Sequence, residues 1–169
     1  MSKKGLSGVI TTVIMIALAI VDITVIWVFV TNFVNKGIED SEACYNIFDK
    51  LTINGQYTCY NPETKELQFS ISVGDIDLSS VYVAVSADKQ VKSYILTDTN
   101  QSFTGMKNST GGTSITMPSK NSGLTYMLNM TLAGFSGAPD SLRVYPAVNG
   151  KKCDSSDSFS EIDNCLSLT

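Results

Sequence analysis

Hydrophobic positions are concentrated in one block near the start of the chain. Among residues 6–34, 21 of 29 are apolar, and Asp22 is the one charged residue from Gly5 to Asn35. At about 1.5 Å per residue a helix over this block is roughly 44 Å long, whereas a bilayer core needs only ~20 apolar residues. The block therefore predicts a membrane-spanning helix, because inside lipid the backbone polar groups must be satisfied within the segment.

The charges on either side of the block predict its orientation. Lys3 and Lys4 precede it, whereas Lys36 and an acidic run at 39–42 follow it. Positive residues stay on the cytoplasmic side of a membrane. We therefore expect the N-terminus in the cytoplasm and the remaining residues, about 130 of them with all four cysteines, outside it, where thiols are oxidised.

Beyond Lys36 the pattern changes to short runs in which every second residue is apolar, as in half-buried strands. The clearest runs are 67–73, 81–85 and 124–132, and weaker ones are 91–96, 114–117 and 142–148, where Pro146 indicates a sheet edge or a strand end. Turn residues separate them, at Gly74-Asp75, Gly111-Gly112, Ser122-Gly123, 138–140 and Asn149-Gly150. The pattern predicts an α+β chain: a long N-terminal apolar helix and a β-rich head of β-sandwich or Ig-like type.

Composition excludes several functions. The chain has 169 residues and no histidine, which rules out catalytic Ser-His-Asp and Cys-His arrangements and His-containing zinc sites. The formal net charge is −4, so the chain lacks the excess of basic residues that nucleic-acid binding requires. No phosphate-binding glycine loop or nucleophile elbow occurs. We therefore expect neither an enzyme nor a cofactor.

Three interpretations of the N-terminus compete. A secretory signal peptide would be cut at a small-x-small site, and Ala17-Leu18-Ala19 has that form, but the apolar run continues well past it. A plain uncleaved signal anchor fits the hydropathy equally well. The third interpretation depends on order, because Lys3-Lys4-Gly5 comes directly before an apolar helix that begins at Leu6 without a spacer.

This order resembles the class III signal of archaeal type IV pilins, in which a prepilin peptidase cuts after the glycine on the cytoplasmic face and the apolar helix is kept. The resemblance maps Lys3, Lys4 and Gly5 onto the end of the leader and Leu6 onto the first mature residue. Residues 13–20 and 27–32 are similar to the rest of the family's helix. The implied domains are a cleaved leader at 1–5, a polymerisation helix at 6–40 and an extracellular head at 41–169.

A helix that is apolar all round suits both lipid and a bundle of like helices. Leader removal would take two lysines from the packed core, where unpaired charge is costly, and leave 10 Lys and Arg against 16 Asp and Glu, a net charge of −6. The resemblance implies a helical homopolymer, a prepilin peptidase, a pilus assembly ATPase and its membrane platform as partners. The expected filament-core residues are Leu6, Ile10, Val13, Ile14, Leu18, Val21, Asp22, Val25, Trp27 and Phe29.

Asp22 is exceptional within this helix, since a central Asp costs roughly 2.5 to 3.5 kcal/mol on insertion scales. One interpretation is that the long apolar run tolerates one acid, protonated or reached by water. The other is that Asp22 pairs inside the filament, with a neighbour's new amine at Leu6 or with the hydroxyls of Thr24 and Thr12. Bacterial pilins place an acid near the mature N-terminus, where this chain has Ile10 and Thr11.

The head shows a weaker resemblance to the β-rich ectodomains that follow class III leaders. It is carried by the order of 69–73, 74–78 and 81–86 and by the late run 144–153. Archaellins, the rotating-filament relatives, commonly have an acidic residue soon after the cleavage site. This chain starts differently, which favours an adhesion-type pilus over an archaellum.

The cysteines fall into two groups, Cys44 with Cys59 and Cys153 with Cys165. Four cysteines allow three connectivities. Local pairing within each group is the expectation, with crossed pairing and free or metal-bound thiols as the alternatives. A four-thiolate zinc site would normally show two C-x-x-C pairs, and neither group has that spacing.

Three N-x-S/T sequons, at Asn100, Asn108 and Asn129, lie in the expected extracellular part, where glycosylation can occur; Asn108 has the most loop-like context. Acidic residues gather in 153–165 and at Asp75 and Asp77, but their spacing does not match a calcium loop, so no metal is expected.

Together these patterns favour a structural subunit of an extracellular archaeal type IV pilus-like filament, with the head exposed for adhesion. The precursor would lie in the cytoplasmic membrane and the product in a filament on the cell surface. The alternative is a monomeric, single-pass, membrane-anchored binding domain. An extracytoplasmic enzyme finds no residues to support it.

Overall fold

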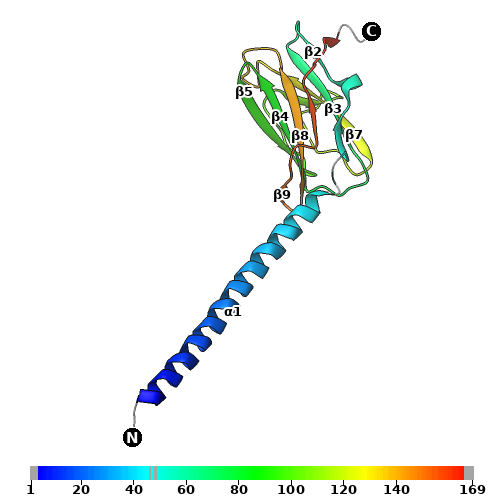
Figure 1. Ribbon diagram of the computed structural model, residues 1–169. Coiled ribbons are helices and arrows are strands. Elements are labelled where there is room, and N and C mark those ends of the chain that lie inside the picture. The colour runs from blue at the N-terminus through cyan, green and yellow to red at the C-terminus, as the bar shows by residue number, and fades with distance from the viewer. Residues whose placement is uncertain (1–3, 46, 48, 166–169) are drawn as a thin grey trace. The chain divides into compact units, whose positions relative to one another are not determined.

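Residues 4–45, 47 and 49–165 are described by a computed structural model of the chain (Figure 1). Contacts divide the chain into two units, Met1–Glu42 and Ala43–Thr169. The first unit is helical from Lys4 onward, and the second, the head, contains the β-strands. The predicted α+β class is confirmed.

The predicted apolar helix is present as α1, Lys4–Tyr45. The hydroxyl of Thr24 donates to the backbone carbonyl of Val21 at 2.8 Å, and that of Thr31 donates to the carbonyl of Trp27 at 2.9 Å. These bonds to the preceding turn let threonine occupy the helix without presenting an unpaired hydroxyl on its apolar surface.

The head consists of two antiparallel sheets of five strands each (Figure 1). The first sheet contains β1 (Leu51–Ile53), β2 (Cys59–Asn61), β3 (Glu66–Val73), β6 (Met106–Asn108) and β7 (Ser122–Asn129). The second sheet contains β4 (Ser80–Ala87), β5 (Gln90–Leu96), β8 (Ser141–Val148), β9 (Lys151–Lys152) and β10 (Asp157–Phe159).

One edge of each sheet is an interrupted strand. In the first sheet β1 and β2 both pair with β3, on either side of the short helix η1 (Gly55–Tyr57), and β7 pairs with β3 on its other side. In the second sheet β9 and β10 both pair with β8 in the same end-to-end manner. Short, broken edge strands of this kind leave little unpaired backbone for adventitious strand addition.

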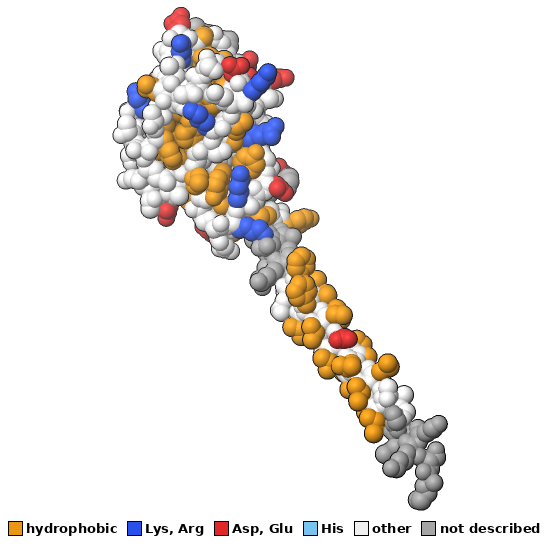
Figure 2. Space-filling model, turned by 90° about the vertical axis from the view of Figure 1, so that its left-hand side faces the viewer, with side chains coloured by type: hydrophobic (Ala, Val, Ile, Leu, Met, Phe, Trp, Pro, Cys, Tyr) orange, Lys and Arg blue, Asp and Glu red, His pale blue; other side chains and the backbone are white. Residues whose placement is uncertain are grey.

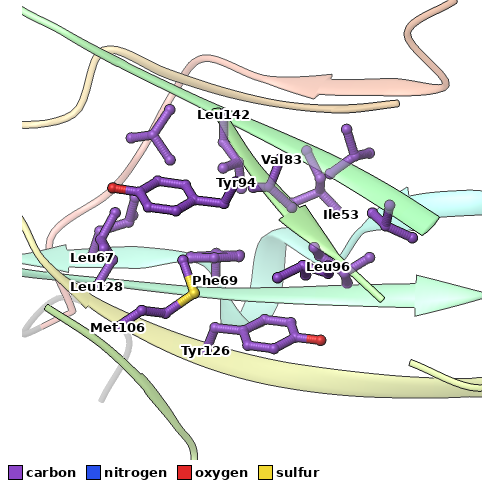
Figure 3. Close-up of a cluster of buried hydrophobic side chains, with 14 of the residues drawn as sticks. Ile53, Leu67, Phe69, Val83, Tyr94, Leu96, Met106, Tyr126, Leu128 and Leu142 are labelled. Carbon is purple, nitrogen blue, oxygen red and sulfur yellow. The ribbon is translucent and has the colours of Figure 1, made fainter. Parts of the chain in front are cut away.

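The core lies between the two sheets and takes side chains from both (Figure 3). Phe69 and Tyr126 of the first sheet are almost fully buried, with ring centroids 5.3 Å apart, and they share the cluster with Val83, Leu96 and Leu142 of the second sheet. Removal of this apolar surface from water is the main force that holds the sheets together. The head is therefore a β-sandwich.

One polar group at the core is satisfied by the backbone. The Tyr126 hydroxyl donates to the Thr116 carbonyl at 2.6 Å, and burial raises the pKa of this phenol. The ring thus fills the core while its hydroxyl keeps a partner, as buried tyrosine requires.

The strands predicted at 67–73, 81–85, 91–96 and 142–148 are confirmed. The run predicted at 124–132 is a strand only as far as Asn129, where β7 ends, and residues 130–132 form a turn. The strand predicted at 114–117 is wrong, because Ile115 makes only an isolated bridge to Gln101. The turn predicted at Ser122-Gly123 is also wrong. Gly123 lies inside β7 opposite Ser72, where an added Cβ would be 3.1 Å from the serine Oγ, so glycine permits a close approach there.

Pro146 was expected at an edge or a strand end, and this too is wrong, since it lies within β8 between β4 and the β9–β10 edge. Its carbonyl accepts from the Cys153 N–H at 2.9 Å, on the side away from β4. In an antiparallel ladder the N–H and C=O of one residue point to the same neighbour. The N–H that proline lacks therefore falls outside the β4–β8 ladder.

Candidate functional site

The largest candidate surface is the apolar part of α1. Within Ile10–Asn35 the most apolar 18-residue stretch has a mean hydropathy of 2.8, and none of that stretch is buried within the chain. At about 1.5 Å per residue these 26 residues extend roughly 39 Å, enough to cross a hydrocarbon core of ~30 Å. The helix is able to anchor the protein in a membrane.

The expected filament-core residues present this surface on every side of α1. Successive residues of a helix are ~100° apart, so the positions do not fall on one stripe. Every apolar member from Ile10 onward is more than half exposed: Ile10, Val13, Ile14, Leu18, Val21, Val25, Trp27 and Phe29. The Leu6 side chain lies outside the described residues. Over Ile10–Asn35 the helix therefore has no polar face that would turn toward water.

Asp22 is exposed on this surface, and within the described residues it forms no ion pair. Thr24, one of its expected partners, already donates its hydroxyl hydrogen to the Val21 carbonyl. Thr24 therefore does not donate a hydrogen bond to the Asp22 carboxylate of the same subunit.

The expected cleavage site falls at the start of α1. Lys4 and Gly5 belong to its first turn, whereas Lys3 lies outside the described residues. Farther along, Gly8 has open space around the position that a Cβ would occupy. The helix thus extends beyond the expected leader boundary toward the N-terminus.

The disulfides correct the expected pairing. Cys44 is bonded to Cys153, with Cα atoms 5.6 Å apart, and Cys59 to Cys165, with Cα atoms 4.9 Å apart. Local pairing was wrong because β1, η1 and β2 run along β3 and carry Cys59 away from Cys44. In the same way, the segment after β9 runs back along β8 and carries Cys165 away from Cys153.

The two bonds fasten different parts of the head. Cys44 is in the last turn of α1 and Cys153 directly follows β9 in the second sheet. Cys165 is fastened to β2 of the first sheet, beside the bridge between Tyr60 and Asn164. Crossed bonds between segments more than 100 residues apart indicate an oxidising, extracytoplasmic environment.

The three sequons differ in how their side chains are used. The Asn108 Oδ1 accepts from the Gly112 N–H at 2.7 Å and the Thr110 hydroxyl at 2.8 Å, while its Nδ2 donates to the Ser114 carbonyl at 3.3 Å. The Asn129 Nδ2 donates to the Thr64 carbonyl at 3.3 Å. Asn100 is exposed, and its side chain has no hydrogen bond to another described residue.

The acidic residues form no metal centre in the part of the chain that is described, where no three metal-ligating side chains come together. Lys120 Nζ lies 3.0 Å from an Asp75 oxygen and 3.5 Å from an Asp77 oxygen. The hydrogen bond and positive charge of Lys120 lower the pKa of Asp75, and Asp75 in turn raises that of Lys120. Asp157 accepts from the Ile53 N–H at 2.8 Å and so joins the two sheets.

A feature that the sequence analysis missed is the outer face of the second sheet. Two tyrosines, Tyr82 and Tyr145, are paired across β4 and β8, and Ile95 of β5 pairs with Tyr82. Lys152 Nζ lies 4.0 Å from the Tyr145 ring centroid and 5.1 Å from that of Tyr82. We call the surface formed by Tyr82, Ala84, Val91, Ile95, Arg143, Tyr145 and Lys152 the tyrosine face.

The signal for this face was present in the sequence, since alternate residues of 81–85 and 142–148 point outward and include both tyrosines. Figure 2 shows apolar and basic side chains together on the side of the head that carries β5 in Figure 1.

A comparison of the chain with protein-family models, curated proteins and solved structures finds no match.

Proposed function

We propose that this protein is a structural subunit of an extracellular type IV pilus-like filament, which polymerises through α1. The observation that carries the proposal is the helix surface, on which Ile10–Asn35 is apolar all round and unburied. A surface of this kind is stable in lipid as a monomer and among copies of itself in a filament. An amphipathic partner would need a polar stripe on the helix beside the apolar one, and this surface has none.

The order of residues at the N-terminus supports the same proposal. A prepilin peptidase would cut after Gly5, so that Leu6 begins the mature chain and two lysines leave the future core. An assembly ATPase and its membrane platform would then draw the helix from the membrane into the filament. The contact between successive helices would be heterologous and open, which generates a fibre rather than a closed ring.

The head would coat the filament and make the adhesive contacts. It is a β-sandwich closed by two disulfides, in keeping with exposure outside the cell. We further propose that it is a glycoprotein. Among its sequons, Asn100 is the exposed one whose amide has no hydrogen bond to another described residue, and therefore the one best placed to carry a glycan.

The test is the mass of the N-terminal peptide together with imaging of the cell surface. We expect a chain that begins at Leu6 and filaments that contain it. Gly5→Val is expected to block cleavage and abolish filaments. Gly8→Ala is the matched control, because the position of a Cβ there is open, and it is expected to be cut normally.

The same experiment distinguishes the alternative, a monomeric membrane-anchored binding domain. An intact leader, with the protein in the membrane and no filaments, would support the anchor and contradict the pilin proposal.

A further inference from the structure

The tyrosine face is free of acidic residues. The strands β4, β5, β8 and β9 contain no Asp or Glu, whereas Arg143 and Lys152 are exposed on them. Val91 and Ile95 add apolar surface, with 64% and 43% of their surface exposed. On a head with 12 acidic and 9 basic residues between 43 and 169, this is a local reversal of the net charge.

Arg143 lies at a depression in this face. The depression has a volume of about 190 Å³ and small side chains, Ala84, Ser86 and Ser141, line it together with Val91 and Tyr145. Within the described residues Arg143 forms no ion pair. A guanidinium beside small residues leaves room for a carboxylate, which it binds through two parallel hydrogen bonds.

The complementary surface is the segment from Cys153 to Cys165, the acidic segment. It contains four acidic residues and no Lys or Arg. Asp154, Glu161 and Asp163 are exposed and form no ion pair with another described residue. Its Phe159 and Ile162 are half-buried and pack against the core of their own head, which leaves the carboxylates as the exposed part of the segment.

The acidic segment borders the tyrosine face only at β10, whose Ser158 pairs with Arg143 of β8; Glu161 and Asp163 come after this strand. Beyond β10 it crosses to the first sheet, where the Tyr60 N–H donates to the Asp163 carbonyl at 2.8 Å and Cys165 is bonded to Cys59. Glu161 and Asp163 therefore lie at the side of the sandwich where the sheets meet. Two different patches on one molecule make a heterologous contact, which repeats from copy to copy.

We propose that the tyrosine face binds the acidic segment of a second copy of this chain, with the carboxylates of Glu161 and Asp163 placed against Arg143 and Lys152. The inference rests on the proposed filament, because there the heads are held close enough for their net negative charges to repel. Pairing a basic face with an acidic segment replaces that repulsion by attraction, and complementary charge fixes register more than it adds affinity.

The test is photo-crosslinking in cells that express the full chain. A photoreactive residue in place of Ile95 is expected to give a covalent dimer whose linked peptide lies within 153–165. The same residue in place of Lys107, exposed on β6 of the first sheet, is the control and is not expected to reach that peptide.

Charge reversal makes the test specific. Arg143→Glu with Lys152→Glu is expected to reduce the Ile95 crosslink at least tenfold, and Glu161→Arg with Asp163→Arg is expected to do the same. The variant that combines all four substitutions should recover it, because the charges of both surfaces are then exchanged. Formation of both disulfides, read from non-reduced peptides, confirms that each variant folds.

The outcomes for this contact and for the filament are separate. Filaments without a crosslink to 153–165 would overturn the contact and leave the filament proposal intact. A crosslink without filaments would support the contact between membrane-anchored copies and contradict the filament. Capture of a polysaccharide or another protein at position 95 in place of a second copy would overturn the contact.

Discussion

Asp22 places one carboxylate on a helix surface that is otherwise apolar and suited to lipid. It is exposed, and Thr24 beside it is already bonded to the helix backbone. An acid at the centre of a spanning helix costs roughly 2.5 to 3.5 kcal/mol, and a charge partner in the filament would offset part of this cost. Pairing with the amine of a neighbour's Leu6 would do so after leader removal.

We therefore expect Asp22→Asn to lower filament yield about tenfold, which corresponds to about 1.4 kcal/mol per subunit. Sheared filaments are quantified against total membrane protein. Equal yields from Asp22→Asn and the unmodified chain would remove the charge-pair hypothesis.

Asn100 makes a second prediction at this scale. Its amide has no described partner, whereas Asn108 and Asn129 donate theirs to backbone carbonyls. Asn100→Gln is expected to remove the glycan mass from the intact protein, and Asn108→Gln is expected to retain it. A glycan found by peptide mass on Asn108 or Asn129 alone would contradict this ranking.

Tyr126 tests the core. Tyr126→Phe leaves the Thr116 carbonyl without its donor, and we expect a loss of about 1–3 kcal/mol in the free energy of unfolding. The control is Tyr57→Phe, which is exposed and should change stability by less than about 0.5 kcal/mol. Both are measured by denaturant unfolding of the full chain in detergent.

The raised pKa of Tyr126 gives the pH dependence a sign. Below about pH 10 the phenol is neutral in both folded and unfolded chains and contributes no slope. Above that pH the unfolded phenol ionises first, so stability falls as pH rises. This fall should be shallower in Tyr126→Phe; an unchanged slope would mean that the phenol is not buried.

At the scale of elements, alternation predicted the long strands correctly. Leu67 to Val73 and Val81 to Val85 face one core with every second residue, and that period is visible in the sequence. The three-residue strands β1, β2, β6 and β10 are too short to show a period. Pro146 was misplaced because its tolerance depends on which neighbour its missing N–H would face, and that is a property of pairing.

The helix could be predicted in the same way, since its apolar run is continuous. The disulfide partners could not, because they depend on how far the edge strands carry each cysteine. The tyrosine face could be predicted only in part: alternation places Tyr82 and Tyr145 outward, but Lys152 reaches the two rings only through the β8–β9 turn. That turn, at Asn149-Gly150 with positive φ at both residues, was predicted, but its consequence for Lys152 was not.

The crossed disulfides carry the prediction for this scale. Non-reduced peptide mapping is expected to show Cys44 linked to Cys153 and Cys59 linked to Cys165. Replacing Cys59 and Cys165 by serine should lower the free energy of unfolding by about 2–5 kcal/mol, as for other native disulfides. Peptides that link Cys44 to Cys59 would contradict the described paths of β1 and β2 along β3 at the edge of the first sheet.

At the scale of the whole molecule, the two units have opposite surface properties. The helix offers apolar surface in all directions, and the head offers polar surface interrupted by the tyrosine face. One unit suits burial among copies and the other suits water. A subunit divided in this way matches a filament with a helical core and a coat of β-sandwiches.

The central claim is polymerisation, and immunogold electron microscopy of negatively stained cells tests it most directly. With an antibody against the head, the account predicts gold particles along thin surface filaments, and their loss in cells that carry Gly5→Val. Label confined to the cell envelope, with no filaments in cells that express the unmodified chain, would contradict it.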